Sequence, residues 1–306
     1  MKVGVNLFKK EEQRYDKISY TSQENSTLKE ILLDKLNFSV RSLSKMKREQ
    51  TILVNGIFKK PSTEIKIGDL IEVKIDEDMA NFTPQDLNTD IIYDDFDLIM
   101  VNKSPFMVVH PTKSHSENTI ANGVTDYIIN QNEKVKIRFV NRLDMNTSGL
   151  VIVAKNAYAH HTLSKDMSDD KVEKKYITIV KGIVENDFGT IDEPIYRPTE
   201  DSIKRVVDDR GQASVTHYKV MERLNDATIL EIKLETGRTH QIRVHMDHIG
   251  HGIIGDELYG YVDEDLINRQ ALHAYSLKFE QPRTKEQLEF KAEIPADMKI
   301  LIEKLK

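Results

Sequence analysis

An aspartate stands directly ahead of an apolar run in the stretch NRLDMNTSGLVIVAKN, which begins at residue 141. Asp144 follows Arg142 and precedes Thr147-Ser148-Gly149, after which the chain continues as the apolar run Leu150–Ala154. A carboxylate beside a buried strand costs free energy unless a cation pairs it or a reaction uses it. Carboxylates act as nucleophiles, general bases or ion-pair partners, although a lone aspartate in a turn is most often a cap. Asp144 is therefore a candidate catalytic residue if the chain supplies a cation.

A cationic partner is available about a hundred residues later, in the segment ETGRTHQIRVHMDHIGHGIIGDELYG that ends at residue 260. The pattern predicts a helix that Thr239 caps and Gly250 ends. His240 and Arg243 are three residues apart and share one face of that helix. Arg243 lies between two apolar residues, and an arginine held in this way usually binds a carboxylate, whose shape its fork matches.

Other chemistries have weaker support in the sequence. A metal site would need several ligands close together, and the sequence has four closely spaced histidines, His240, His245, His248 and His251. They form no HExxH pattern and no cysteine accompanies them, so we expect no metal site. Ser148 lacks the G-x-S-x-G elbow of a hydrolase, and no Walker or Rossmann glycine pattern occurs. A carboxylate-based glycosidase would need a second acid, for which Asp247 and Asp256 remain candidates.

The composition is that of an ordinary globular protein. The 306 residues are 39% hydrophobic and 31% charged, with a formal net charge of -6 and no cysteine. Disulfides, thiol nucleophiles and cysteine-ligated zinc are thereby excluded. The first residues lack the apolar core of a signal peptide, and no run approaches the roughly 18 apolar residues of a membrane helix. We expect a cytoplasmic monomer without a membrane partner.

Residues 14–76 read as a small module with a local positive charge. The pattern predicts a helix near residues 27–36, a second, basic helix that Ser39 caps, and a hairpin at Asn55-Gly56. Lysines and arginines outnumber acids across residues 29–60, although the whole chain is acidic. Such clustering suits nucleic-acid binding, and charge alone supports a solvated face equally well.

The remainder of the chain mixes strands and helices. Residues 76–90 are polar, contain Pro84 and are predicted to be a linker. Beyond them, strands are predicted near 97–104 and 228–234, with a helix near 119–131. Because the strands come in neighbouring runs, we expect an α+β fold with a largely antiparallel mixed sheet and flanking helices. The expected domains are residues 1–80 and residues 81–306.

The module resembles the small RNA-binding domain first seen in ribosomal protein S-four. The resemblance is carried by Ser39, Arg41, Ser42, Val54-Asn55-Gly56 and Gly68-Asp69. It implies a basic helix pair backed by a small sheet, which offers cations to phosphates. The residues expected to bind RNA are Arg41, Lys45, Lys47 and Arg48.

The larger region resembles RNA pseudouridine synthases of the RluA/RluD family. The motifs that carry this likeness are IIYDDFDLIMVNKSPFMVVHP, NRLDMNTSGLVIVAKN, KKYITIVKG, TGRTHQIRVHMDHIGHGIIGDELYG and LHAYSLKFEQP. They occur in the expected order between about residues 87 and 290. The resemblance implies the pseudouridine synthase fold, an isomerase that needs no cofactor, and RNA as the partner, either ribosomal or transfer RNA. The sequence departs from the family pattern at Asn141, where histidine is usual.

The resemblance also implies a role for each matched residue. Asp144 would be catalytic, attacking the ribose or removing a ribose proton to give a glycal. Arg243 would pair with it, and Tyr176 would stack on the uracil. The remaining expected RNA contacts of this region are Arg142, His240 and Leu272. The alternative from another class is a catalytically silent RNA-binding or ribosome-assembly factor, which would not need to keep Asp144, Tyr176 and Arg243 together.

Overall fold

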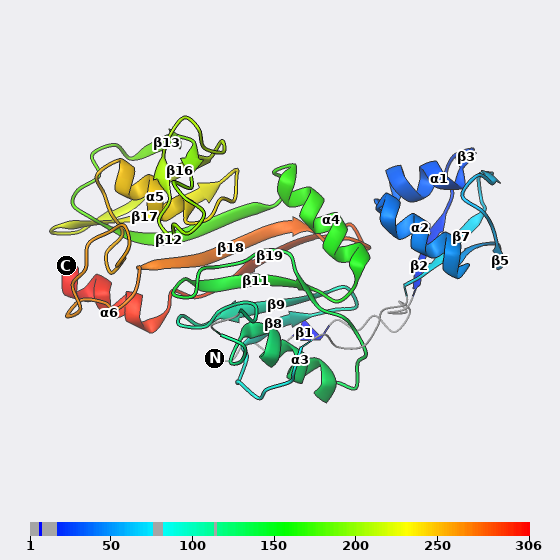
Figure 1. Cartoon of the computed structure of the whole chain (residues 1–306), viewed down its shortest axis with the longest axis horizontal. Coiled ribbons are helices and arrows are strands. Elements are labelled where there is room, and N and C mark those ends of the chain that lie inside the picture. The colour runs from blue at the N-terminus through cyan, green and yellow to red at the C-terminus, as the bar shows by residue number, and fades with distance from the viewer. Residues whose placement is uncertain (1–5, 8–16, 76–81, 113–114) are drawn as a thin grey trace.

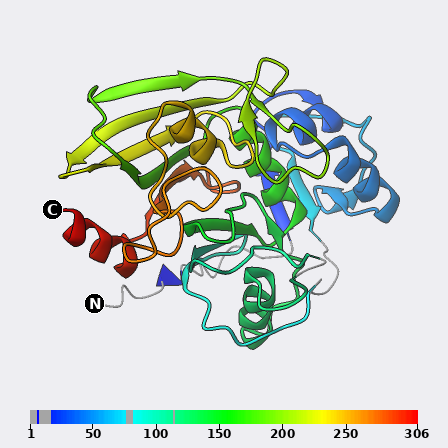
Figure 2. The same ribbon diagram turned by 60° about the vertical axis from the view of Figure 1, so that its left-hand side comes forward.

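The computed structural model of the chain describes residues 6–7, 17–75, 82–112 and 115–306. Two bodies are visible in it, a small N-terminal unit and a larger one built on a long sheet (Figure 1). Turning the molecule shows the small unit next to helix α4 (Ala157–Ser168), whose Tyr158 packs into the core of that unit (Figure 2). The linker predicted at residues 76–90 lies partly outside the described residues.

The small unit contains a four-stranded sheet in the order β2-β7-β4-β5 and a short β3–β6 pair. Its strands are β2 (Lys17–Thr21), β3 (Ser26–Thr27), β4 (Ile52–Val54), β5 (Ile57–Phe58), β6 (Glu64–Ile65) and β7 (Leu70–Lys74). Its helices are α1 (Leu28–Glu30), which continues as the π-helix η1 (Ile31–Lys35), and α2 (Val40–Glu49). Ser39 caps α2 by accepting from the Ser42 N–H, as the sequence predicted. Asn55 and Gly56 form the predicted turn between β4 and β5 with positive φ.

The larger body is organised around an eleven-stranded sheet in the described residues, with the main order β1-β8-β9-β11-β18-β12-β17-β16-β13. Its first strands are β1 (Asn6–Leu7), β8 (Ile91–Asp94), β9 (Leu98–Lys103), β10 (Arg138–Phe139) and β11 (Ser148–Ala154). The others are β12 (Glu173–Lys181), β13 (Phe188–Asp192), β16 (Val215–Arg223), β17 (Ala227–Leu234), β18 (Leu272–Glu280) and β19 (Gln287–Lys291). A separate hairpin pairs β14 (Ile195–Tyr196) with β15 (Val206–Val207). Only the β1–β8 and β11–β18 pairings of this sheet are parallel among the described residues, so the expected largely antiparallel mixed sheet is confirmed.

Helices cover both faces of the sheet. They are α3 (Ile120–Asn130), α4 (Ala157–Ser168), α5 (Gln241–His248) and α6 (Ala296–Leu305). The apolar run Leu150–Ala154 forms most of β11, and helices cover both faces of this strand. Helix α3 packs on the face of Val151 and Val153, and α4 packs on the face of Leu150 and Ile152. A strand buried on both faces reads as continuous apolar sequence. In the part of the chain that the structure describes, no helix has the length and apolar content needed to cross a bilayer.

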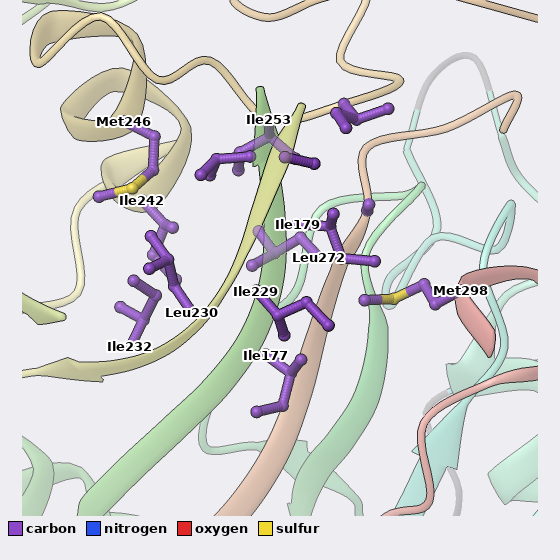
Figure 3. Packing of buried hydrophobic residues seen from close by; sticks show 14 of the residues in the cluster. Ile177, Ile179, Ile229, Leu230, Ile232, Ile242, Met246, Ile253, Leu272 and Met298 are labelled. Carbon is purple, nitrogen blue, oxygen red and sulfur yellow. The ribbon is translucent and has the colours of Figure 1, made fainter. Parts of the chain in front are cut away.

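A second core forms where α5 and α6 meet strands β12, β17 and β18. Ile242 of α5 lies on the side of β17 to which Leu230 points, and Leu272 of β18 lies between Ile179 of β12 and Met298 of α6 (Figure 3). These side chains are almost completely excluded from solvent. Burying each one stabilises the fold by roughly 1.5–3 kcal/mol. The packing fixes the start of α5 against the sheet, and α5 carries the predicted partner of Asp144.

Candidate active site

Asp144 lies in the loop that joins β10 to β11. The Thr147 N–H donates to the Asp144 carbonyl at 3.1 Å and closes the turn. Two residues later the chain passes so close to β18 that a Cβ on Gly149 would lie 2.2 Å from the Ala274 carbonyl oxygen, and Gly149 has a φ of +114°. Only glycine fits such a position. Thr147-Ser148-Gly149 therefore sets the direction in which the loop presents Asp144.

Asn141 serves as part of the sheet. Its amide donates to the Leu150 carbonyl at 3.1 Å and accepts from the Ile152 N–H at 2.8 Å. Both groups belong to the backbone of β11, so the side chain acts as an extra pairing partner for that strand. The residue that departs from the family pattern holds the loop in place.

Arg243 of α5 binds two carboxylates at once. Its Nη1 donates to Asp144 Oδ2 at 2.9 Å, while Nε and Nη2 donate to the two oxygens of Asp256 at 2.6 Å and 2.7 Å. The Asp144 side chain is 31% exposed, whereas those of Arg243 and Asp256 are 9% and 0% exposed. One side of the guanidinium is thus locked inside the protein and the other faces the open carboxylate. The predicted pairing of Asp144 with Arg243 is present in the structure.

Asp256 is fully occupied as a structural anion. Its Oδ1 also accepts from the N–H groups of Leu258 and Tyr259, at 3.0 Å and 3.2 Å. Burial opposes the charge of Arg243, but the hydrogen bonds and charge of Asp256, with the charge of Asp144, raise the Arg243 pKa above its ordinary value. Because Asp256 is buried and fully bonded, it is a poor second acid for a glycosidase, which needs two carboxylates facing the substrate.

His240 immediately precedes α5 as its N-cap residue and faces the same aspartate. It adopts a left-handed conformation with a φ of +61°, so the helix starts one residue later than predicted and the Thr239 cap is wrong. Its Nε2 lies 3.8 Å from Asp144 Oδ2, and its Nδ1 lies 2.9 Å from the Tyr259 hydroxyl. Burial lowers the pKa of His240 below its ordinary value, against the charge of Asp144. The left-handed strain is offset by the contact with Tyr259, which the sequence did not reveal.

Tyr176 of β12 lies within electrostatic reach of Asp144. Burial raises the pKa of its phenol to about 12, and the charge of Asp144 adds to the effect. Strand β12 pairs with β18, and β18 pairs with β11, so the sheet brings Tyr176 beside the Asp144 loop. Leu272 is 4% exposed and packs in the core, whereas Arg142 is exposed beside Asp144.

Lys103 supports the Asp144 loop from inside the protein. Its ammonium donates to the carbonyls of Ser104, Met107 and Met145 at 3.0 Å, 2.8 Å and 2.9 Å, and the residue is only 1% exposed. Burial lowers the pKa of Lys103 to about 7, with a further contribution from Arg269 and an opposing one from Asp144. A lysine at the end of a strand is usually exposed, so sequence reasoning missed it.

Lys103→Met should destabilise the fold and loosen the Asp144 loop. Three carbonyls would lose the donor that joins them, and a polar group left unsatisfied costs about 1–3 kcal/mol. We expect a fall of at least about 2 kcal/mol in the free energy of unfolding, with faster amide hydrogen exchange at residues 144–147. The matched control is Lys219→Met, since Lys219 is exposed on β16. Equal stabilities of the two variants would contradict the anchoring role.

Ser148 and His273 form a buried pair between β11 and β18. Ser148 Oγ lies 2.9 Å from His273 Nδ1, and His273 Nε2 lies 3.3 Å from the Ala292 carbonyl oxygen. Burial lowers the pKa of His273 to about 4. The neutral ring accepts from the serine hydroxyl and donates to the carbonyl. Ser148 thus ties the strand that follows Asp144 to its parallel neighbour.

His273 should make stability fall in mild acid. Its pKa drops from 6.5 to about 4 on folding, so between these values the unfolded chain binds a proton that the folded chain does not bind. The stability is present above about pH 6.5 and decreases as the pH falls toward 4. His273→Gln should show a decrease smaller than that of the wild type by roughly 2 kcal/mol between about pH 7 and about pH 5, measured by urea unfolding. His248→Gln, at an exposed histidine, is the control, and an unchanged decrease in His273→Gln would refute the assignment.

The small unit faces the larger body across a cavity of about 850 Å³, which we call the inter-unit cavity. Arg41, Lys45 and Arg48 of α2 line it together with Lys136 and Arg138 of the larger body. The predicted RNA-binding residue Lys47 is exposed on the same helix and does not line this cavity. Among the described residues, no group of three or more acids and histidines is placed to hold a metal ion.

Comparison with known proteins adds independent findings. Residues 97–248 match the family model described as RNA pseudouridylate synthase. The chain is 41% identical over 263 residues to the uncharacterized RNA pseudouridine synthase YlyB of Bacillus subtilis (strain 168), covering 85% of this chain and 87% of that protein. It is 37% identical over 270 residues to ribosomal large subunit pseudouridine synthase D of Escherichia coli (strain K12), covering 83% of this chain and 82% of that protein.

A solved structure shares the fold. Human RNA pseudouridylate synthase domain containing 1 superposes with a TM-score of 0.57 and 26% sequence identity. The match covers 70% of this chain and 86% of the human one.

Proposed function

This chain belongs to the RNA pseudouridine synthase family, whose members isomerise uridine to pseudouridine, and we propose that Asp144 is its catalytic residue and ribosomal RNA its substrate. The observation that carries the site is the half-open carboxylate of Asp144, held at 2.9 Å by an arginine that a second, buried carboxylate immobilises. Ribosomal RNA is supported by the similarity to the large-subunit synthases named D.

The reaction detaches a uracil from its ribose, turns it, and reattaches it through carbon. The enzyme must first take the base out of its stack, which costs a few kcal/mol. We propose that Tyr176 stacks on the extruded uracil, an interaction that contributes roughly 1–3 kcal/mol. The phenol is neutral at physiological pH, and burial raises its pKa further, to about 12. A neutral aromatic beside Asp144 offers a surface for the uracil without adding a second negative charge.

Asp144 acts at the ribose in either of two ways. As a nucleophile it would attack the anomeric carbon, and as a base it would remove a ribose proton to give a glycal. Both routes need the Asp144 carboxylate to keep a fixed position. The hydrogen bond from Arg243 Nη1 holds it there. The exposed Arg142 is placed to contact the extruded nucleotide or its backbone, and His240 adds a second polar group facing Asp144.

We further propose that residues 1–80 form an RNA-binding domain. Arg41, Lys45 and Arg48 follow one another at helical spacing on α2 and line one wall of the inter-unit cavity. Lys136 and Arg138 line it from the catalytic body. A cavity with cations on both walls suits the phosphate backbone of a structured RNA. Domain and catalytic body would then bind the same RNA.

Removing the cations of α2 should reduce the salt dependence of RNA binding. The triple variant Arg41→Ala, Lys45→Ala, Arg48→Ala should flatten the slope of log affinity against log salt by about 0.7–0.9 for each phosphate that is no longer neutralised. The control removes the same charge from exposed lysines of the same unit outside the cavity, Lys29, Lys60 and Lys66. If both triple variants change the slope equally, the cavity has no special role.

The substrate can be tested directly with purified protein. Large-subunit ribosomal RNA and total transfer RNA, each transcribed without modification, are incubated separately with the enzyme, and pseudouridine is mapped by nucleotide. We expect pseudouridine at defined positions of the ribosomal RNA. Mapping cellular RNA from strains with and without the protein should show the same positions. Modification of transfer RNA alone would overturn the ribosomal assignment and leave the family unaffected.

A further inference from the structure

A cavity of about 380 Å³ lies between the β14–β15 hairpin and the start of α5. Pockets of about 300–1,000 Å³ are typical of ligand sites. Arginines from three segments line it: Arg197 and Arg205 from the hairpin, Arg210 from the loop that follows, and Arg238 from the turn before α5. We call this cavity the arginine pocket. Figure 1 shows α5 beside β16, at this end of the sheet.

The charges of three of these arginines are not compensated by acids. Arg197 donates to the Ser202 carbonyl, Arg205 to the carbonyls of Ser202 and Ile203, and Arg238 to the Ala213 carbonyl. Among the described side chains, no carboxylate forms an ion pair with any of the three. A carbonyl satisfies one hydrogen bond and leaves the positive charge in place. Several such guanidinium groups around one cavity suit an anion with several oxygens, such as a phosphate.

The fourth arginine supplies a flat surface. Arg210 forms two hydrogen bonds with Asp208, at 2.8 Å and 2.7 Å, so its charge is compensated. Its guanidinium lies 4.5 Å from the ring centroid of Tyr196, which also lines the pocket. Unpaired bases stack on aromatic rings and on arginine planes. The pocket therefore combines a place for a phosphate with a place for a base.

Two hydrogen bonds and one longer polar contact connect the arginine pocket to the catalytic centre. The Arg205 backbone N–H donates to the Tyr259 hydroxyl at 2.6 Å, and that hydroxyl lies 2.9 Å from His240 Nδ1. His240 Nε2 in turn lies 3.8 Å from Asp144 Oδ2. Arg238 precedes His240 by two residues, at the same end of α5. The pocket and Asp144 therefore lie on either side of Tyr259 and His240.

We propose that the arginine pocket is a subsite for a nucleotide that flanks the target uridine, with its phosphodiester at Arg197, Arg205 and Arg238 and its base on the Tyr196–Arg210 surface. The inference rests on the proposed function. Binding there would hold the strand on one side of the extruded uridine. The subsite would position the substrate and take no part in the bond changes.

The test measures RNA binding in an Asp144→Asn background, so that turnover does not interfere. Large-subunit ribosomal RNA transcribed in vitro is titrated between about 50 mM and about 200 mM salt. Arg197→Ala with Arg238→Ala should weaken binding about tenfold and flatten the salt slope by about 0.7–0.9, because one phosphate is no longer neutralised. Arg197→Lys with Arg238→Lys keeps the charges and should retain the slope. The matched control is Lys299→Ala with Lys306→Ala, which removes the same charge from exposed residues of the C-terminal helix and its end.

Turnover and small anions provide the remaining arms. With Asp144 intact, the double alanine variant should raise KM about tenfold and change kcat less than about threefold. The proposal would be overturned if Arg197→Ala with Arg238→Ala gave the same salt slope as the control Lys299→Ala with Lys306→Ala. So would an unchanged slope together with tight binding of inorganic phosphate or uridine monophosphate, which would make the pocket a small-anion site. If the wild type formed no pseudouridine yet the slopes differed as expected, the proposed function would fail and the RNA subsite would stand.

Discussion

Asp144→Asn should abolish pseudouridine formation while leaving RNA affinity within a few-fold of the wild type. The amide has nearly the same shape, but it is neither a nucleophile for the ribose nor a base for its proton. Removal of a catalytic nucleophile costs factors as large as about 10⁶, so we expect the single-turnover rate to fall by at least about 10⁴. The measurement is the rate of pseudouridine formation at saturating ribosomal RNA.

The fold should tolerate this substitution. Arg243 keeps both hydrogen bonds to Asp256, so the guanidinium remains paired after the charge of Asp144 is removed. Asp144 is also the more exposed of the two carboxylates, at 31%. Asp247→Asn, at an exposed aspartate of the same α5, is the matched control and should retain full activity. Wild-type turnover by Asp144→Asn would refute the catalytic role, and the silent-scaffold alternative predicts no turnover in any variant.

The sequence predicted the pair at the centre of this site because each partner has a strong local signal. Asp144 precedes a run that must be buried, and Arg243 lies among apolar residues on a helix, so each needed an opposite charge. The largely antiparallel sheet followed from the order of the strands. These inferences use only local periodicity and the cost of burying charge.

The residues that the sequence did not reveal act through tertiary contacts. Lys103 ends a strand, and nothing nearby in the sequence shows that three carbonyls will surround it. Asp256 lies in a loop after α5, and its role depends on that loop folding back onto Arg243. The start of α5 was misplaced for a similar reason, because His240 takes a left-handed conformation to reach Tyr259. Such contacts override local propensity.

The arrangement around Arg243 explains how an exposed carboxylate can be held still. A surface ion pair contributes little because both side chains move. Here the arginine is 9% exposed and Asp256 fixes two of its nitrogens, so only the Asp144 side of the network faces the substrate. A catalytic carboxylate must keep its position within a fraction of an ångström. Asp256 is therefore a positioning residue that acts through Arg243.

Asp256→Asn should slow the chemical step about 10²–10³-fold without weakening RNA binding. The amide presents a hydrogen-bond donor to one guanidinium nitrogen and leaves Arg243 with one carboxylate in place of two. The arginine is then free to rotate, and a misplacement of about 1 Å costs on the order of 10² in rate. Breaking one partner of a buried ion pair also destabilises a fold by about 3–5 kcal/mol. The experiment compares single-turnover rates at saturating RNA with unfolding free energies.

The matched control is Asp97→Asn. Asp97 is fully buried and binds Arg283 through both oxygens, at 2.6 Å and 3.2 Å, in a network that does not include Asp144. The Asp97→Asn variant should lose about as much unfolding free energy as Asp256→Asn, and its folded fraction should keep the single-turnover rate of the wild type. If Asp97→Asn were as slow as Asp256→Asn, the slower rate would come from general destabilisation. A slow Asp256→Asn beside a fast Asp97→Asn requires that the orientation of Arg243, and through it the position of Asp144, limits the reaction.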